Sequence, residues 1–166
     1  MKINITTIKR ERGASLDFSF SALPEKIALG EIVDIFQGEI LVSGRVTNLG
    51  TSLLVTGMIN ADTKNSCARC LKELVRKVEV DFSEEFVSCK DETIAEDVYT
   101  YQEELLNLQD LVVELLLVEQ PIKALCQDDC KGLCLSCGVD LNISTCACDN
   151  LSVNPKLLAL KDYKFD

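Results

Sequence analysis

Eight of the nine cysteines in this chain occur as four close pairs. The pairs are Cys67/Cys70, Cys126/Cys130, Cys134/Cys137 and Cys146/Cys148. Two thiolates a few residues apart are what one tetrahedral zinc ion takes from a single reversal of the chain. Four such pairs therefore predict two structural zinc centres of four cysteines each, which hold a shape and carry out no chemistry. Only Cys89 is left without a partner in this pattern.

Spacing assigns the last four cysteines to one zinc ion. Cys134 and Cys137 are followed by Gly138, which permits the tight reversal of a zinc knuckle. Cys146 and Cys148 follow soon after, and closing so short a loop costs little entropy. We expect these four residues to form one centre.

The other two pairs, Cys67/Cys70 and Cys126/Cys130, are 56 residues apart along the chain. They can meet at a second zinc ion if a helix at 107–120 returns the chain to a hairpin tip at 67–70. Spacing alone leaves another arrangement open, in which partners are exchanged and Cys130 joins Cys134 and Cys137.

Nothing in the sequence favours an enzyme. A catalytic zinc ion usually has three protein ligands and an open position for water, whereas these cysteines come in fours. The chain has no histidine, the commonest general base, and no glycine-rich phosphate loop. We expect no catalytic residue, no organic cofactor and no small-molecule substrate.

Two alternatives from other classes are open. A thiol redox protein could use Cys67 and Cys70, because Arg69 between them could lower a thiol pKa. Redox motifs of this spacing open a helix after a strand, however, and this one lies at an expected hairpin tip. A zinc-ribbon regulator that binds nucleic acid directly is the other alternative, and the acidic composition argues against it.

The elements that must position the cysteines are mostly strands. Alternating or β-branched residues predict strands at Ile3 to Ile8, 15–20, 40–47, 53–63, 74–87 and 98–101. A wide apolar face over 107–120 predicts the main helix, with Asn107 as N-cap and Pro121 after its end. We therefore expect an α+β fold, an antiparallel β-sheet or partly open barrel packed by one main helix, with a C-terminal Cys-rich zinc-binding lobe.

Three parts are expected along the chain. Residues 1–121 should form the α+β domain, with a zinc knuckle at the 67–70 hairpin tip. Residues 122–150 lack a useful hydrophobic period, so metal must order them as a Cys-rich lobe. Residues 151–166 should form a C-terminal helix or tail, with Pro155 at the first helical position.

The formal net charge is −10, and two four-cysteine zinc centres would bring it to roughly −14. Five cations cluster between Lys64 and Lys77 and could touch RNA phosphates, namely Lys64, Arg69, Lys72, Arg76 and Lys77. Thirteen acids and one base lie between Glu79 and Glu119, which would attract a basic protein. The plainer interpretation is a solvated face followed by an acidic loop.

No run of 18 apolar residues exists, and the N-terminus has no continuous apolar segment of a signal peptide. We expect a cytoplasmic protein without a membrane segment. In that reducing compartment free thiols bind metal and do not form disulfides.

The spacing also resembles a known family. The relevant residues are Cys67-Ala-Arg-Cys70-Leu71, the leucine-rich stretch ending at Pro121, Leu125-Cys126, Asp129-Cys130-Lys131-Gly132-Leu133-Cys134, Cys137-Gly138, Asp140-Leu141-Asn142 and Cys146-Ala-Cys148. This pattern resembles the YceD family of bacteria and plastids, whose members are described as large-subunit ribosomal RNA accumulation proteins. The position after Cys134, usually proline in the family, is Leu135 here. The usual Asp-Pro near the end is Asn154-Pro155.

The resemblance implies a zinc-binding factor in ribosome biogenesis that supports accumulation or processing of large-subunit ribosomal RNA. Its partner would be a ribosomal protein, the large-subunit RNA precursor, or both. Family members that lack the later four cysteines keep the first pair and a pair near 126 and 130. The resemblance therefore implies that Cys67/Cys70 and Cys126/Cys130 share one centre.

Overall fold

The computed structural model describes residues 1–89 and 98–148, and the helix or tail expected at 151–166 lies outside this part. The chain divides into two compact units. Of the described residues, the first unit comprises Met1–Asn65 and Leu74–Ile122, and the second comprises Ser66–Glu73 and 123–148. The hairpin tip at 67–70 is therefore grouped with the Cys-rich segment.

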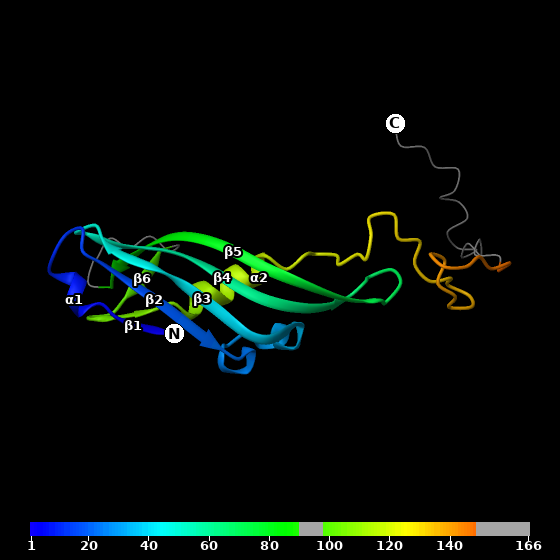
Figure 1. The fold of residues 1–166 in the computed structure, drawn as a ribbon, viewed down its shortest axis with the longest axis horizontal. Helices are drawn as coiled ribbons and strands as arrows, with labels where there is room; N and C mark the ends of the chain where they lie inside the picture. Colours follow the sequence, from blue (N-terminus) through cyan, green and yellow to red (C-terminus); the bar gives the residue numbers. More distant parts are fainter. Residues whose placement is uncertain (90–97, 149–166) are drawn as a thin grey trace, which may run out of the picture. The chain divides into compact units, whose positions relative to one another are not determined.

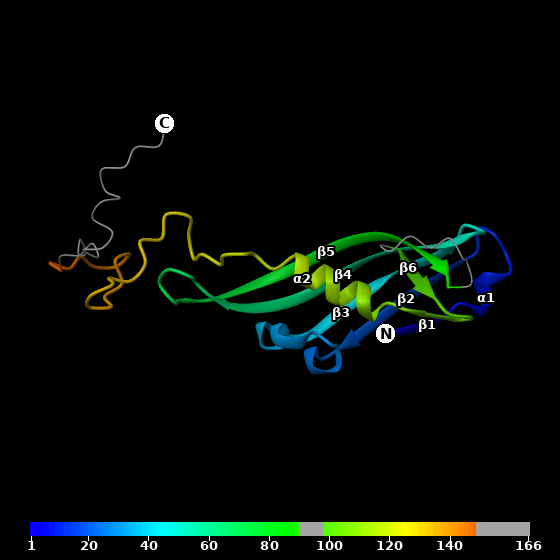
Figure 2. The same ribbon diagram turned by 180° about the vertical axis from the view of Figure 1, so that it is seen from behind.

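A five-stranded sheet is the frame of the first unit (Figures 1 and 2). Its strands, in spatial order, are β2 (Ser15–Ala22), β3 (Phe36–Asn48), β4 (Ser52–Ser66), β5 (Glu73–Ser88) and β6 (Tyr99–Tyr101). Strands β2, β3 and β4 pair antiparallel, as the alternating segments predict. Among the described residues the sheet stays open, with β2 and β6 at its edges.

Strand β6 departs from the expectation of an antiparallel sheet, because it runs parallel to β5. The Tyr99 ring stacks on Phe86 of β5 with 5.1 Å between ring centroids. The Tyr99 hydroxyl donates a hydrogen bond to the carboxylate of Glu114, which lies on α2 (Gln109–Val118). These two contacts hold the short strand beside the sheet in this direction.

The N-terminal strand is shorter than the sequence suggests. β1 (Lys2–Asn4) pairs antiparallel with β7 (Leu105–Asn107), and Ile8 lies in a short helix, α1 (Thr6–Lys9). The strand ends because the Asn4 side chain accepts a hydrogen bond from the Thr6 N–H at 2.9 Å and turns the chain. Two 3₁₀ turns, η1 (Pro24–Lys26) and η2 (Gly30–Ile35), connect β2 with β3.

Helix α2 lies within the predicted segment 107–120. Its backbone N-cap is Leu108, one residue later than expected. The Asn107 side chain nevertheless accepts a hydrogen bond from the Gln109 N–H at 3.2 Å, so it satisfies one of the free donors at the helix start. In the described part of the chain no helix is long and apolar enough to cross a membrane.

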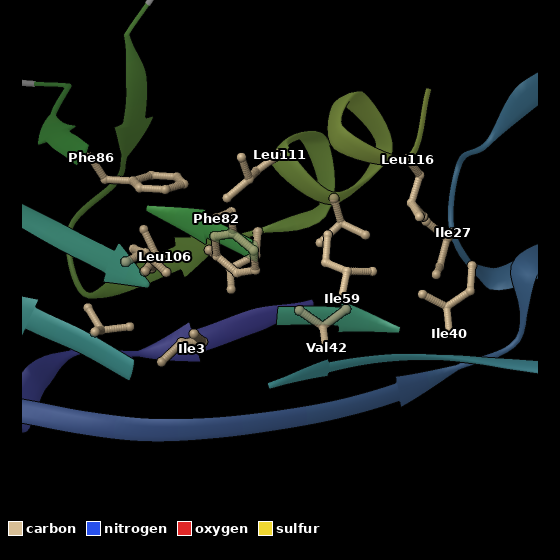
Figure 3. Packing of buried hydrophobic residues seen from close by; sticks show 14 of the residues in the cluster. Ile3, Ile27, Ile40, Val42, Ile59, Phe82, Phe86, Leu106, Leu111 and Leu116 are labelled. Atoms are coloured by element: carbon tan, nitrogen blue, oxygen red, sulfur yellow. The ribbon is translucent and has the colours of Figure 1, made fainter. Parts of the chain in front are cut away.

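One hydrophobic cluster contains residues of the sheet, of the β1/β7 pair and of α2. Figure 3 shows Leu111 of the helix near Phe82 of β5, and Leu116 near Ile27. Its largest fully buried members include Ile5, Ile40, Ile59, Phe86, Leu106, Leu108, Leu111 and Leu116. Burying each such side chain contributes about 1.5–3 kcal/mol, so this cluster is the main source of stability of the first unit.

Two glycines face each other at the centre of the sheet, Gly44 on β3 and Gly57 on β4. A Cβ atom on Gly44 would lie 2.1 Å from the Thr56 carbonyl oxygen, and one on Gly57 would lie 2.8 Å from Cζ of Phe82. Phe18 on β2 is paired directly with Gly44. The rings of Phe18 and Phe82 thus occupy the space that side chains at the two glycines would need.

Candidate metal centres

The first candidate centre joins the β4–β5 tip to the C-terminal segment. Cys67 and Cys70 lie in the turn, and Cys126 and Cys130 come from the segment after α2. The Sγ atoms of Cys67 and Cys130 are 3.8 Å apart, and those of Cys70 and Cys126 are 3.6 Å apart. All four sulfurs lie within 4.8 Å of one another.

These distances fit a tetrahedral metal ion. With a zinc–sulfur distance of 2.3 Å, the edge of the sulfur tetrahedron is about 3.8 Å. The same distances are far longer than the ~2.05 Å of a disulfide bond. Three of the four cysteines are buried and Cys126 is half-buried. The group therefore could hold one metal ion that is closed off from solvent on most sides.

Backbone hydrogen bonds shape the first knuckle. The Cys67 N–H donates to the Lys72 carbonyl and the Leu71 N–H donates to the Cys67 carbonyl, each at 2.9 Å. The N–H groups of Cys70 and then Arg69 point to the Cys67 sulfur and lower the pKa of that thiol to about 6. The turn thus stabilises the thiolate, which is the form that binds metal.

Cys126 shows the opposite effect. The neighbouring Cys130 sulfur, together with burial, raises the pKa of the Cys126 thiol to about 12. Sulfurs this close cannot all become thiolates unless a cation lies among them. A divalent metal ion is a cation that this donor set could hold.

The side chain of Arg69 fastens the C-terminal segment to the knuckle. Its Nη1 donates to the Cys130 carbonyl at 2.7 Å and to the Asp128 carbonyl at 3.3 Å. The Arg69 carbonyl in turn accepts a hydrogen bond from Leu133 N–H at 3.1 Å. Gly132 passes so close that a Cβ there would lie 3.0 Å from the Arg69 carbonyl oxygen. Sequence reasoning placed Arg69 among phosphate contacts and missed these bonds.

The second candidate centre lies within the C-terminal segment. Cys134, Cys137, Cys146 and Cys148 have their sulfurs within 4.8 Å of one another. The N–H groups of Cys137 and then Ser136 lower the pKa of the Cys134 thiol to about 6. The Cys137 sulfur raises the pKa of the Cys148 thiol to about 12. This group has the same mixture of stabilised and suppressed thiolates, but Cys137 and Cys148 are exposed.

The two knuckles repeat one backbone geometry. In the second, Cys134 N–H donates to the Val139 carbonyl at 2.8 Å and Gly138 N–H donates to the Cys134 carbonyl at 2.9 Å. These bonds match those around Cys67, and the residue after the second cysteine is left-handed in both knuckles. The structure forms the two groups of four that spacing and family resemblance suggest, and Cys130 is not grouped with Cys134 and Cys137.

The five cations predicted to contact RNA are divided between the two units. Lys64 lies in β4, while Arg76 and Lys77 lie in β5 of the first unit. Arg69 and Lys72 belong to the knuckle of the second unit. Lys77 lines a shallow hollow on the sheet together with carboxylates, those of Glu39, Asp62 and Glu79.

Cys89 takes no part in either group of four. It is exposed after the end of β5, where its N–H donates to the Tyr101 carbonyl at 3.1 Å. Asn142 was noted in sequence only as part of the family pattern and was assigned no role. Its side-chain amide donates to the Cys130 sulfur at 3.4 Å, and an asparagine two residues after Asp140 is only a weak turn signal in sequence.

Fold and site together define a mainly β-sheet protein with two four-cysteine groups that could hold metal ions. A sequence model described as "Large ribosomal RNA subunit accumulation protein YceD" matches residues 55–164, and the chain belongs to the YceD family. The role implied by that name concerns accumulation of the large ribosomal RNA subunit.

Similar curated proteins occur in mycobacteria, and all carry the description "uncharacterized protein". Those of Mycobacterium bovis and Mycobacterium tuberculosis are 35% identical over 147 residues, which cover 85% of this chain and 70% of theirs. A Mycobacterium leprae protein is 29% identical over 144 residues, covering 83% of this chain and 66% of its own length. No solved structure matches the chain.

Proposed function

We propose that this protein is a non-enzymatic, zinc-binding factor of cytoplasmic ribosome biogenesis that supports accumulation or processing of large-subunit ribosomal RNA. The observation that carries the proposal is membership of the YceD family, with the matched region containing all eight paired cysteines. Family membership supports the RNA-related role, and the cysteine geometry supports the metal.

Zinc is the metal that suits these groups best. Four cysteine sulfurs at tetrahedral spacing and no open ligand position are typical of structural zinc. Each centre would contribute roughly ten kcal/mol of apparent binding free energy. That is comparable with the whole stability of a small domain, so metal would decide whether the second unit folds.

A basic ribosomal protein is the partner that the sheet surface favours. Glu79, Asp81 and Glu85 alternate along β5 with apolar residues that pack against the core, and all three are exposed. Asp62 on β4 and Glu39 on β3 are exposed as well. Four of the predicted cations, Lys64, Lys72, Arg76 and Lys77, would supply a smaller contact to the phosphates of the precursor RNA.

A thiol redox role is less well supported. A redox-active Cys67–Cys70 pair needs an accessible thiolate, whereas Cys67 is fully buried in the structure. Counting free thiols before and after mild peroxide treatment separates the two functions. A rapidly formed, readily reduced Cys67–Cys70 disulfide in the metal-loaded protein would favour the redox role.

The central test is genetic. Cells that lack the protein should contain less mature large-subunit RNA relative to small-subunit RNA, and the wild-type chain should restore the ratio. A C67S/C70S variant should fail to restore it, whereas C89S, which changes a cysteine outside both groups, should succeed. An unchanged RNA ratio in cells without the protein would overturn the proposal.

The partner is tested by capture from cell extract. Tagged wild-type protein should recover a basic large-subunit protein, and the E79K/D81K variant should recover less of it. The matched control E11K/E25K changes the net charge equally at exposed positions outside the sheet. Loss of capture by both variants would indicate a general charge effect, and recovery of RNA without any ribosomal protein would shift the proposal to direct RNA binding.

A further inference from the structure

We propose that the two metal centres are energetically coupled and that Asn142 is the positioning residue that couples them. This inference rests on the proposed metal binding and concerns how the second centre regulates retention of metal at the first. Asn142 lies in sequence between the two ligand pairs of the second centre, Cys134/Cys137 and Cys146/Cys148. Its side chain, however, contacts a ligand of the first centre.

The contact is a hydrogen bond from Asn142 Nδ2 to the Cys130 sulfur, at 3.4 Å. The Oδ1 atom of the same side chain accepts the Lys131 N–H at 2.8 Å. Asn142 therefore contacts both the ligand residue and the backbone immediately after it. A donor to a thiolate sulfur disperses its charge and fixes its direction, as outer-shell partners of metal ligands do.

Asn142 is itself held in place by its own loop. Its N–H and its Nδ2 donate to the Asp140 carboxylate, at 2.9 and 2.6 Å. Leu141 N–H donates to the Gly132 carbonyl at 2.9 Å, and Asp140 forms a bridge with Leu133. The chain leaving the second knuckle thus folds back along 130–133, the link between the two centres.

Closure of the second centre should therefore order the loop that presents Asn142 to Cys130. A bound metal would join Cys134 and Cys137 to Cys146 and Cys148 and would so restrain both ends of that loop. When the second centre is empty, the loop gains conformational freedom and the bond to Cys130 forms less often. Because coupling between binding sites is reciprocal, metal at the first centre also favours binding at the second.

The experiment measures zinc transfer from the full chain to a chromogenic chelator. C146S/C148S removes the second centre, N142A removes the amide, and a third variant combines them. We expect C146S/C148S and N142A each to speed release from the first centre about ten-fold, the low end for outer-shell residues. Because both act through the same bond, the combined variant should be scarcely faster than either.

A matched control is I143A, which truncates the next residue, whose side chain is 85% exposed. It should leave release unchanged. Coupling is overturned if C146S/C148S leaves first-centre release at the wild-type rate, or if its effect multiplies with that of N142A. Absence of metal from the first centre of C146S/C148S would support coupling, and the N142A measurement still tests the assigned residue.

Spectroscopy separates the amide contact from a general loosening of the fold. The ¹¹³Cd resonance that is still present in C146S/C148S belongs to the first centre. With cadmium in both centres, N142A should shift this resonance, whereas I143A should not. An unshifted resonance would overturn the role of Asn142. A purified chain with no bound metal would instead overturn the proposed zinc binding, so the two failures are distinguishable.

Discussion

Leu71 and Gly138 occupy the same position in the two knuckles. Each follows the second cysteine, and the N–H of each donates to the carbonyl of the first cysteine. Both are left-handed, with φ of 60° at Leu71 and 73° at Gly138. Glycine adopts this conformation freely, whereas for a leucine it costs about 1–2 kcal/mol. The Leu71 side chain is 65% exposed, so packing offsets little of that cost.

Exchanging these residue types should therefore have opposite effects at the two knuckles. L71G should relieve the backbone and slow metal release from the first centre by up to several-fold, a gain of about 1 kcal/mol at most. G138L should accelerate release from the second centre. Chelator kinetics on each variant check both directions, and faster release from L71G would show that the exposed leucine stabilises the knuckle.

The facing glycines of the sheet make a separate prediction about stability. G44A and G57A should each lower the free energy of unfolding by about 1–3 kcal/mol, because a methyl group at either position meets backbone or the rings of Phe18 and Phe82. Urea denaturation measures the loss. S43A, an exposed neighbour of Gly44, is the control and should change little.

Stability at high pH should depend on Tyr99. Burial, with a smaller contribution from the hydrogen bond to Glu114, raises the pKa of this phenol above its ordinary value of about 10. A raised folded-state pKa means that the stabilisation is complete below pH 10 and is lost as the pH rises towards the folded value. Y99F should be less stable than wild type at pH 7, and the difference should shrink above pH 10 in urea titrations. A constant difference would contradict this assignment.

Substitutions of Arg69 and Lys72 should distinguish a structural role at the metal centre from a role in RNA contact. R69A removes the donor to the Cys130 and Asp128 carbonyls and should speed loss of metal from the first centre. K72A should leave metal retention unchanged, because the contact assigned to Lys72 is with phosphate. Metal release and RNA binding measured on both variants check this. Equal metal release from the two variants would show that the Arg69 side chain does not hold the centre together.

Removing metal should affect the two units differently. The first unit has its own hydrophobic cluster, whereas among the described residues of the second unit few are buried apart from its cysteines. Excess chelator should therefore make 123–148 sensitive to protease and leave most of the β-sheet circular dichroism signal intact. Protection of this segment after complete metal removal, verified by elemental analysis, would show that contacts other than metal fold it.

Much of the sheet could be predicted because its apolar residues alternate. Ile40 and Val42 on β3 are buried while Leu41 between them is exposed, which is the period-two pattern that sequence makes visible. The sequence predicted a strand at 98–101, but it could not predict that β6 pairs parallel with β5, because three residues carry no signal for the direction of a partner. Its direction depends on Phe86 and Glu114, which are distant in sequence.

The candidate centres were accessible from sequence for a similar reason. Closely spaced pairs of thiols are typical of zinc sites, so residue type and spacing are informative by themselves. The supporting contacts were not accessible. Arg69 and Asn142 act through backbone carbonyls and a sulfur brought near by the fold, and their residue types suit many other positions.

The first centre takes its ligands from two places, Cys67 and Cys70 in the middle of the chain and Cys126 and Cys130 beyond α2. During synthesis the β4–β5 hairpin is made long before its last ligand emerges. The proposed centre can close only after Cys130 has left the ribosome. Until then the Cys67 and Cys70 thiols lack their two partner ligands. Under the proposed zinc binding, metal capture at this centre must follow synthesis of the segment after α2, and a chain that stops before Cys130 would lack one of the four ligands.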